Sequence, residues 1–262
     1  IWDELGRNAH WRNRPDKGQP FFSVFNIEVT HESQAFPTSP ARKGKPPVTD
    51  LEKIQLPPYY PDTLLVRQEL ARVYDNIADM DAQVGELLRQ LDQDGLAGNT
   101  IVFYWSDHGD GVPRAKRSLY DSGLHVPLMI RWPAPLGSTL TPGTVRDDLV
   151  SFVDLAPTML SVAGMGPPAW MQGRAFAGKH LAKANDFLHG FRGGMDERYD
   201  FQRSVTDGRY VYLRNYMPNL PAGQHVEYMF QTKTTAVWKN LFDKGKLNEA
   251  QSIFWKAPRP AE

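Results

Sequence analysis

The stretch TIVFYWSDHGDG, residues 100–111, decides how the rest of the chain is interpreted. Its first half is a run of β-branched and aromatic residues, which predicts a buried strand over residues 100–105. The glycines that follow end this strand and permit close approach of the backbone. Asp107 and His108 therefore stand at the carboxyl end of a strand, where open α/β sheets place their ligands. For this dipeptide alone, the alternative is a turn in which Asp107 caps a loop and His108 forms a local hydrogen bond.

A long amphipathic helix precedes this strand. Apolar residues recur every three or four positions from Val66 to Leu91, which predicts one continuous face packed in the core. Asp62 or Thr63 can cap the start of the helix, and Gly95 is a suitable stop. A helix of this length can cross a sheet and return the chain to a parallel strand.

The crossover predicts which residues meet. Residues 21–29 are a second apolar run, expected to form a buried strand parallel to residues 100–105. A strand–helix–strand crossover brings the carboxyl ends of both strands to the same edge of the sheet. His31, just after the first strand, is therefore expected to lie near Asp107 and His108.

Residues 126–132 predict a further strand, and the loop before them carries Arg114, Lys116 and Arg117. Three cations beside the expected site would suit an anionic substrate. The alternative is an exposed basic turn.

The character of the chain changes near residue 180. Before it, Asp154 and a proline in the first turn predict an apolar helix that stops near Gly164. After it, an Asp-Gly pair at Asp207 predicts a hairpin, and the segment 224–256 is mostly helical and polar. We expect a core portion over residues 1–180 and the start of a smaller C-terminal subdomain over residues 181–262.

The composition excludes several classes. Thirty basic and thirty acidic side chains cancel among 262 residues, which gives no strong field for nucleic acid. No run of residues is long and apolar enough to predict a membrane span. The chain contains no cysteine, which excludes disulfides and a thiol nucleophile within it. The first and last residues resemble no natural chain end, so a fragment is expected. The sequence does not set the oligomeric state.

Taken together, several motifs resemble the type I sulfatases of the alkaline phosphatase-like superfamily. The resemblance covers most of the chain and is carried by FFSVFN with THES (residues 21–33), MDAQVGELL with DGLAGNTIV (80–102), SDHGD (106–110), Lys116, YD (120–121), VPL (126–128), FVDLAPT (152–158) and VTDGRY (205–210). Residues 190–193 and 195–199 look most like the heparan N-sulfatase (sulfamidase) branch. The resemblance implies an α/β fold: a mostly parallel, alkaline phosphatase-like sheet sandwiched by helices, plus part of a C-terminal α+β subdomain.

The resemblance also implies roles for individual residues. Asp107 matches a carboxylate ligand of an active-site divalent cation, calcium in most members, and His108 matches the neighbouring ligand position. Lys116 matches the lysine that contacts the substrate sulfate, and His31 matches the histidine that protonates the leaving group. Arg192 is a candidate for lining the substrate pocket, with a structural ion pair as the alternative. Together, a cation, an ammonium group and an acid suit sulfate transfer.

The implied function is hydrolysis of sulfate esters or sulfamates on sulfated carbohydrates. Family members use a formylglycine nucleophile made from Cys or Ser in an upstream Cys/Ser-x-Pro-x-Arg motif, and no such motif precedes residue 21. We therefore expect the nucleophile on a missing N-terminal segment and the isolated chain to be inactive. Two alternatives remain: a phosphodiesterase or phosphomutase-like member of the superfamily, and a non-catalytic protein that binds sulfated glycans. By resemblance alone, the location is periplasmic, extracellular or lysosome-like.

Overall fold

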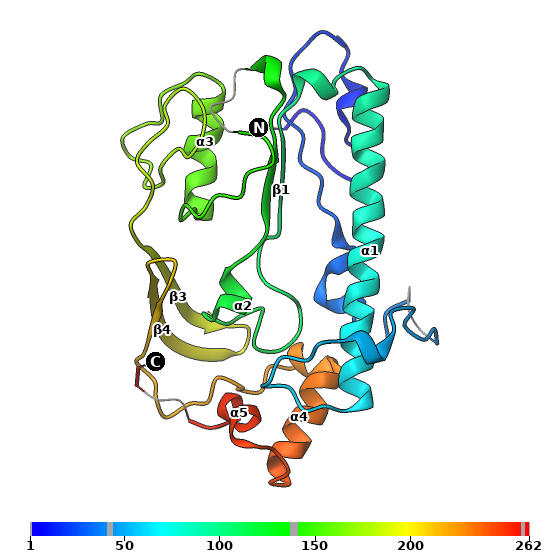
Figure 1. The fold of residues 1–262 in the computed structure, drawn as a ribbon, viewed down its shortest axis with the longest axis vertical. Coiled ribbons are helices and arrows are strands. Elements are labelled where there is room, and N and C mark those ends of the chain that lie inside the picture. The colour runs from blue at the N-terminus through cyan, green and yellow to red at the C-terminus, as the bar shows by residue number, and fades with distance from the viewer. Residues whose placement is uncertain (1, 41–43, 137–140, 258–259, 262) are drawn as a thin grey trace.

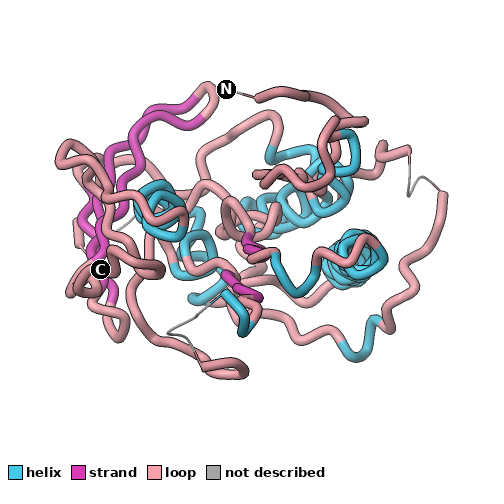
Figure 2. Tube along the Cα trace, turned by 90° about the horizontal axis from the view of Figure 1, so that it is seen from above, coloured by secondary structure: helices cyan, strands magenta, loops and turns pink. Residues whose placement is uncertain are grey.

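The computed structural model describes residues 2–40, 44–136, 141–257 and 260–261. The helix α1, Leu64–Gln93, lies along one side of the molecule, and a three-stranded sheet lies on the opposite side (Figures 1 and 2). Within the described part of the chain, no helix combines the length and apolar character that a membrane span needs. The other elements are β1 (Val102–Trp105), α2 (Asp121–Leu124), β2 (Leu128–Arg131), α3 (Leu155–Val162), β3 (Leu188–Met195), β4 (Arg198–Thr206), β5 (Val211–Asn215), α4 (Lys233–Asp243) and α5 (Glu249–Ser252), joined by short 3₁₀ turns.

The boundaries predicted for the long helix are confirmed. The hydroxyl of Thr63 accepts a hydrogen bond from the backbone N–H of Val66, and Gly95 has a φ of +69° just beyond the last turn. The apolar face is buried near the start of α1 and at Leu91, whereas Ile77 in its middle is 43% exposed. The core packing expected along this face is therefore incomplete in the middle of the helix, where Met80 is half-buried beside the hydroxyl of Tyr104.

The strands expected around residues 100–105 and 126–132 form as β1 and β2, shorter than predicted. They pair antiparallel, from Val102 opposite Arg131 to Trp105 opposite Leu128. The expectation of a buried strand is wrong for β1, which is only partly buried and leaves Trp105 38% exposed. This sheet has two strands in the described part of the chain, so one edge of β1 has no strand beside it.

The expectation of a strand over residues 21–29 is wrong. Residues 21–27 belong to no ladder, and Glu28–Thr30 form a 3₁₀ turn. Alternate side chains such as Phe22 and Val24 are exposed. A strand needs a neighbouring backbone to pair with, and the paired neighbour of β1 is β2. Among the described residues, all ladders are antiparallel, so the parallel pairing expected from the crossover is not formed.

The C-terminal sheet has the strand order β3-β4-β5, with every neighbouring pair antiparallel. The predicted hairpin is confirmed as β4 and β5. The carboxylate of Asp207 accepts hydrogen bonds from the N–H groups of Arg209 and Tyr210, and Gly208 has a φ of +88°. The predicted helix before residue 164 is α3. β3 was not predicted, because its three glycines interrupt any period-two pattern.

One buried cluster joins residues 54–71 and the basic loop, residues 112–118, to the C-terminal helices. Its centre is Trp238 on α4, fully buried and stacked on Phe254 at 4.8 Å. Glu69 of α1 accepts hydrogen bonds from the first N–H groups of α4, which fixes the two helices together. The cluster comprises Ile54, Tyr60, Val66, Leu70, Ala71, Val112, Ala115, Trp238, Phe254 and Trp255. Its members lie on both sides of residue 180, and the domain boundary expected there stays a prediction.

Candidate active site

Asp107 and His108 follow β1 after one residue, Ser106. The Asp107 side chain is 83% exposed, and its Oδ2 lies 3.5 Å from Nε2 of His108. Nδ1 of His108 lies 2.6 Å from the carbonyl oxygen of Gly109 and must donate a proton to it, because a carbonyl can only accept. In the neutral ring, Nε2 then keeps its lone pair. A carboxylate and a lone-pair nitrogen are thus presented together at the end of a strand.

Close backbone packing holds the loop that follows. A Cβ on Gly109 would lie 1.9 Å from a carbonyl oxygen of α2, and one on Gly111 would lie 2.7 Å from Cα of Glu32. Only glycine fits at contacts this short. Because Glu32 follows His31 in the chain, residues 107–111 and the turn that carries His31 lie against each other. Packing of loops, rather than pairing of parallel strands, brings them together.

His31 stands at the surface as the N-cap of a 3₁₀ turn, Glu32–Gln34. Its Nδ1 accepts a hydrogen bond from the N–H of Ser33 and lies 2.9 Å from the Ser33 hydroxyl. In the neutral ring the proton therefore sits on Nε2. The ring of Tyr228 packs 6.3 Å away, centre to centre. His31 can present an N–H toward solvent from a turn whose next residue is buried.

Ion pairs with carboxylates hold the basic loop in place. Glu32 Oε2 lies 3.4 Å from Nζ of Lys116 and 2.9 Å from Nη1 of Arg117. Arg117 Nε also lies 3.2 Å from Oδ2 of Asp196, at the turn between β3 and β4. The alternative of an exposed basic turn is therefore wrong for Lys116 and Arg117, whose side chains are 18% and 9% exposed.

The pKa of Asp110 reflects the charges around it. Desolvation by the surrounding protein raises the pKa of its carboxyl, and the charge of Glu32 raises it further. Hydrogen bonds from the N–H groups of Gly111 and Val112 and the charge of His108 oppose that rise. His108, Asp110 and Glu32 are thus within electrostatic reach of one another at the end of β1.

Sequence comparison assigns the family. The family profile described as Sulfatase matches residues 8–165, more than half of the 262 residues. This chain belongs to the sulfatase family.

Two curated relatives show how far the likeness extends. The sulfatase chain is 38% identical over 293 aligned residues to an ulvan-active sulfatase of Formosa agariphila, covering 100% of this chain and 48% of the relative. It is 30% identical over 185 residues to an endo-4-O-sulfatase of Bacteroides thetaiotaomicron, covering 63% of this chain and 33% of the relative. The chain thus spans about half the length, or less, of these relatives.

Solved structures support the fold. A Bacteroides thetaiotaomicron protein from its metabolism of multiple glycosaminoglycans superposes with a TM-score of 0.52 and 23% identity, over 75% of this chain and 42% of that one. A candidate sulfatase from Bacteroides fragilis gives 0.50 and 23%, over 81% and 51%. The predicted α/β, alkaline phosphatase-like fold class of this sulfatase chain is confirmed.

Arg192 makes a different contact from the other predicted residues. Its Nε lies 2.9 Å from Oδ2 of Asp200, and the two side chains are only 6% and 3% exposed. Burial lowers the pKa of the Arg192 guanidinium, and the charge of Asp200 raises it again. These contacts favour the structural ion pair that the sequence left open. Its role as a substrate contact stays a prediction.

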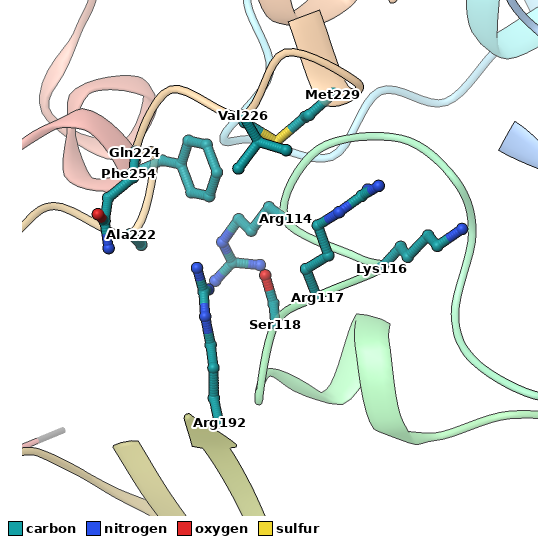
Figure 3. Close-up of a pocket in the computed structure, with 10 residues that line it drawn as sticks. All are labelled: Arg114, Lys116, Arg117, Ser118, Arg192, Ala222, Gln224, Val226, Met229 and Phe254. Atoms are coloured by element: carbon teal, nitrogen blue, oxygen red, sulfur yellow. The ribbon is translucent and has the colours of Figure 1, made fainter. Parts of the chain in front are cut away.

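A small cavity separates Arg192 from the basic loop. Figure 3 shows Arg192 reaching from β3 toward Arg114, with Val226 and Met229 across the space. The cavity has room for about one water molecule, so it is no site for a sugar. Arg114 lies between the rings of Tyr59 and Tyr120, 4.2 Å and 4.0 Å from their centres.

Asp107 and His108 offer two donors to the divalent cation that the sulfatase family implies. The lone-pair Nε2 of His108, with Nδ1 bonded to a carbonyl, is the arrangement expected of a metal-ligating histidine. The exposed carboxylate of Asp107 is an oxygen ligand of the kind calcium prefers. In the described ranges, no group of three or more Asp, Glu, His or Cys side chains could hold a metal ion. Asp107 and His108 therefore fit one part of a coordination shell.

Sequence reasoning missed the residues that organise this site. Glu32 was part of a recognised motif, but nothing in its local pattern indicated that its carboxylate would be buried against Lys116 and Arg117. Asp196 lies 79 residues beyond its partner Arg117. A signal existed in the uncompensated charges of the basic loop, which needed acidic partners somewhere in the fold.

Proposed function

We propose that this chain forms part of the active site of a sulfatase that removes sulfate groups from sulfated carbohydrates. The observation that carries the proposal is the contact through buried Glu32. It joins the turn that carries His31 to the loop that carries Lys116, next to Asp107 and His108. The family match and the named activities of the relatives support the same reaction class.

Each residue has a chemical task in this proposal. Breaking a sulfate ester leaves an alkoxide, which departs readily only if it receives a proton. His31 can supply that proton from Nε2, because its Nδ1 is occupied by Ser33. Lys116 presents an ammonium group to the sulfate oxygens and stabilises negative charge that develops there. Arg192 is retained as a predicted substrate contact.

Asp107 and His108 would hold a divalent cation, and we propose calcium. Once bound, such a cation supplies Lewis-acid stabilisation of the sulfate oxygens. The resemblance implies a formylglycine nucleophile made from Cys or Ser, and these 262 residues contain no cysteine. We place the nucleophile outside the chain, in line with the share of the relatives that it spans. A location outside the cytoplasm is proposed on the resemblance.

The general-acid role of His31 gives the sharpest test. The enzyme from the complete reading frame would be assayed on a sulfated saccharide and on an aryl sulfate, in wild type and in His31→Ala. We expect the variant to lose roughly 100- to 10,000-fold in kcat on the saccharide, whose alkoxide needs a proton. It should lose far less on the aryl sulfate, whose phenolate leaves unaided. The matched control is His180→Ala, an exposed histidine remote from this site in the chain.

The same assay decides between the alternatives. Equal losses on both substrates would contradict the role of His31. Hydrolysis of phosphodiesters in place of sulfates would favour the phosphodiesterase class, and tight glycan binding without turnover would favour a non-catalytic protein. Parallel assays on O-sulfated and N-sulfated glucosamine would identify the linkage that is cleaved.

A further inference from the structure

Glu32 is the most deeply buried charged group near the proposed site. Its side chain has no exposed surface, and its carboxylate faces two cations of the basic loop. Burying a lone carboxylate costs several kcal/mol, so the charge must be matched within the fold. Lys116 and Arg117 supply that match.

The backbone fixes where this carboxylate starts. Gly111 packs so closely on Glu32 that a Cβ there would lie 2.7 Å from both Cα and Cβ of Glu32. The N–H of Lys116 donates to the carbonyl oxygen of Asp110 at 2.8 Å, which closes the loop between them. Glu32 and the backbone of Lys116 are therefore held at a set separation, and the 3.4 Å contact between their side chains follows from it.

The two cations depend on Glu32 to different degrees. Arg117 has a second carboxylate, Asp196 at 3.2 Å, and its guanidinium lies 5.7 Å from the centre of the Tyr228 ring. Among the described residues, Glu32 is the one ion-pair partner of Lys116. Loss of the Glu32 charge would thus leave Arg117 anchored and release the Lys116 ammonium.

We propose that Glu32 is the positioning residue of Lys116. It directs the ammonium group toward the place where the turn of His31 and the end of β1 meet. This inference rests on the proposed function, in which Lys116 contacts the sulfate. Glu32 itself touches no substrate and acts only through Lys116.

A double-mutant cycle on activity tests the proposal. Glu32→Gln keeps the shape of the side chain and removes its charge, and we expect kcat/KM on a sulfated saccharide to fall about 10- to 100-fold. Lys116→Met should fall further. The double variant should be no worse than Lys116→Met, because Glu32 has nothing left to position. Full additivity would overturn the proposal, since it would show that Glu32 acts independently of Lys116.

A second readout needs no turnover. Acetylation of Lys116 by an amine-reactive ester, followed by peptide mass spectrometry, is compared with that of exposed Lys53 in the same sample. In Glu32→Gln, we expect the Lys116 rate to rise several-fold relative to Lys53, because its carboxylate partner is gone. An unchanged ratio would overturn the proposal.

The two readouts also separate this inference from the proposed function. If wild type hydrolyses no sulfate but the labelling ratio rises, the proposed function fails while the Glu32–Lys116 contact stands. If Glu32→Gln does not fold, Glu32→Asp takes its place: it keeps the charge but withdraws the carboxylate by one methylene. It should raise the labelling ratio to a smaller extent.

Discussion

The buried pair of Arg192 and Asp200 gives a stability prediction that also decides the role of Arg192. The two side chains are 6% and 3% exposed, and Nε lies 2.9 Å from Oδ2. Removing one member of such a pair leaves an unmatched buried charge, at a cost of about 3–5 kcal/mol. Asp200→Asn removes the carboxylate charge and should therefore lower the free energy of unfolding by that amount.

Arg192→Met should cost less than Asp200→Asn, about 2–3 kcal/mol, because the carboxylate left behind keeps other hydrogen-bond donors, which reduces the roughly 3–5 kcal/mol cost of an unmatched buried charge. The carboxylate of Asp200 keeps two donors, the N–H of Phe201 at 2.8 Å and the amide of Gln202 at 3.2 Å. With both charges gone together, Arg192→Met/Asp200→Asn should lie within about 1–2 kcal/mol of wild type. The coupling energy is then at least about 3 kcal/mol.

Urea unfolding followed by tryptophan fluorescence measures all four proteins. The matched control is the exposed pair Lys183–Asp186, with side chains 77% and 65% exposed, where Lys183→Met should cost less than about 1 kcal/mol. Single-variant costs below about 1 kcal/mol that simply add in the double variant would refute the structural role. Arg192 would then be free to act as the substrate contact that the sequence suggested.

Three further predictions follow from packing and titration. Gly111→Ala should lower both stability and activity, because the added Cβ would lie 2.7 Å from Glu32. The control Gly85→Ala on α1 has open space around it, and thermal unfolding should show that it stabilises the protein by about 0.5–1 kcal/mol. Trp238→Ala should lower the free energy of unfolding in urea by about 3–5 kcal/mol, because this side chain is fully buried and its Nε1 donates to a backbone carbonyl. A decrease of less than about 1 kcal/mol would contradict its place in the core. Hydrogen bonds from the N–H groups of Tyr210 and Arg209 lower the pKa of Asp207 below its ordinary 3.8. The contribution of these hydrogen bonds to stability is present above pH ~4 and is lost as the pH falls through the lowered pKa. The difference in melting temperature between wild type and Asp207→Ala should therefore narrow in acid. A difference that stays constant with pH would contradict this role of Asp207.

The sequence by itself determined the local elements of this protein. The period of apolar residues, Thr63 and Gly95 set the bounds of α1, and the Asp207-Gly208 pair set the hairpin, because these signals act through neighbouring residues. The order and spacing of motifs also identified the family, while the roles expected for individual side chains stay predictions.

Only the tertiary structure decided what those side chains touch. Residues 21–29 carry a strand pattern, but a strand forms only where another backbone pairs with it, and in the described part of the chain no ladder includes them. Glu32 and Lys116 are 84 positions apart, so no local pattern could pair them. The sequence determines which side chains can carry a charge. Whether it is buried, and beside which partner, depends on the packing of segments that are distant along the chain.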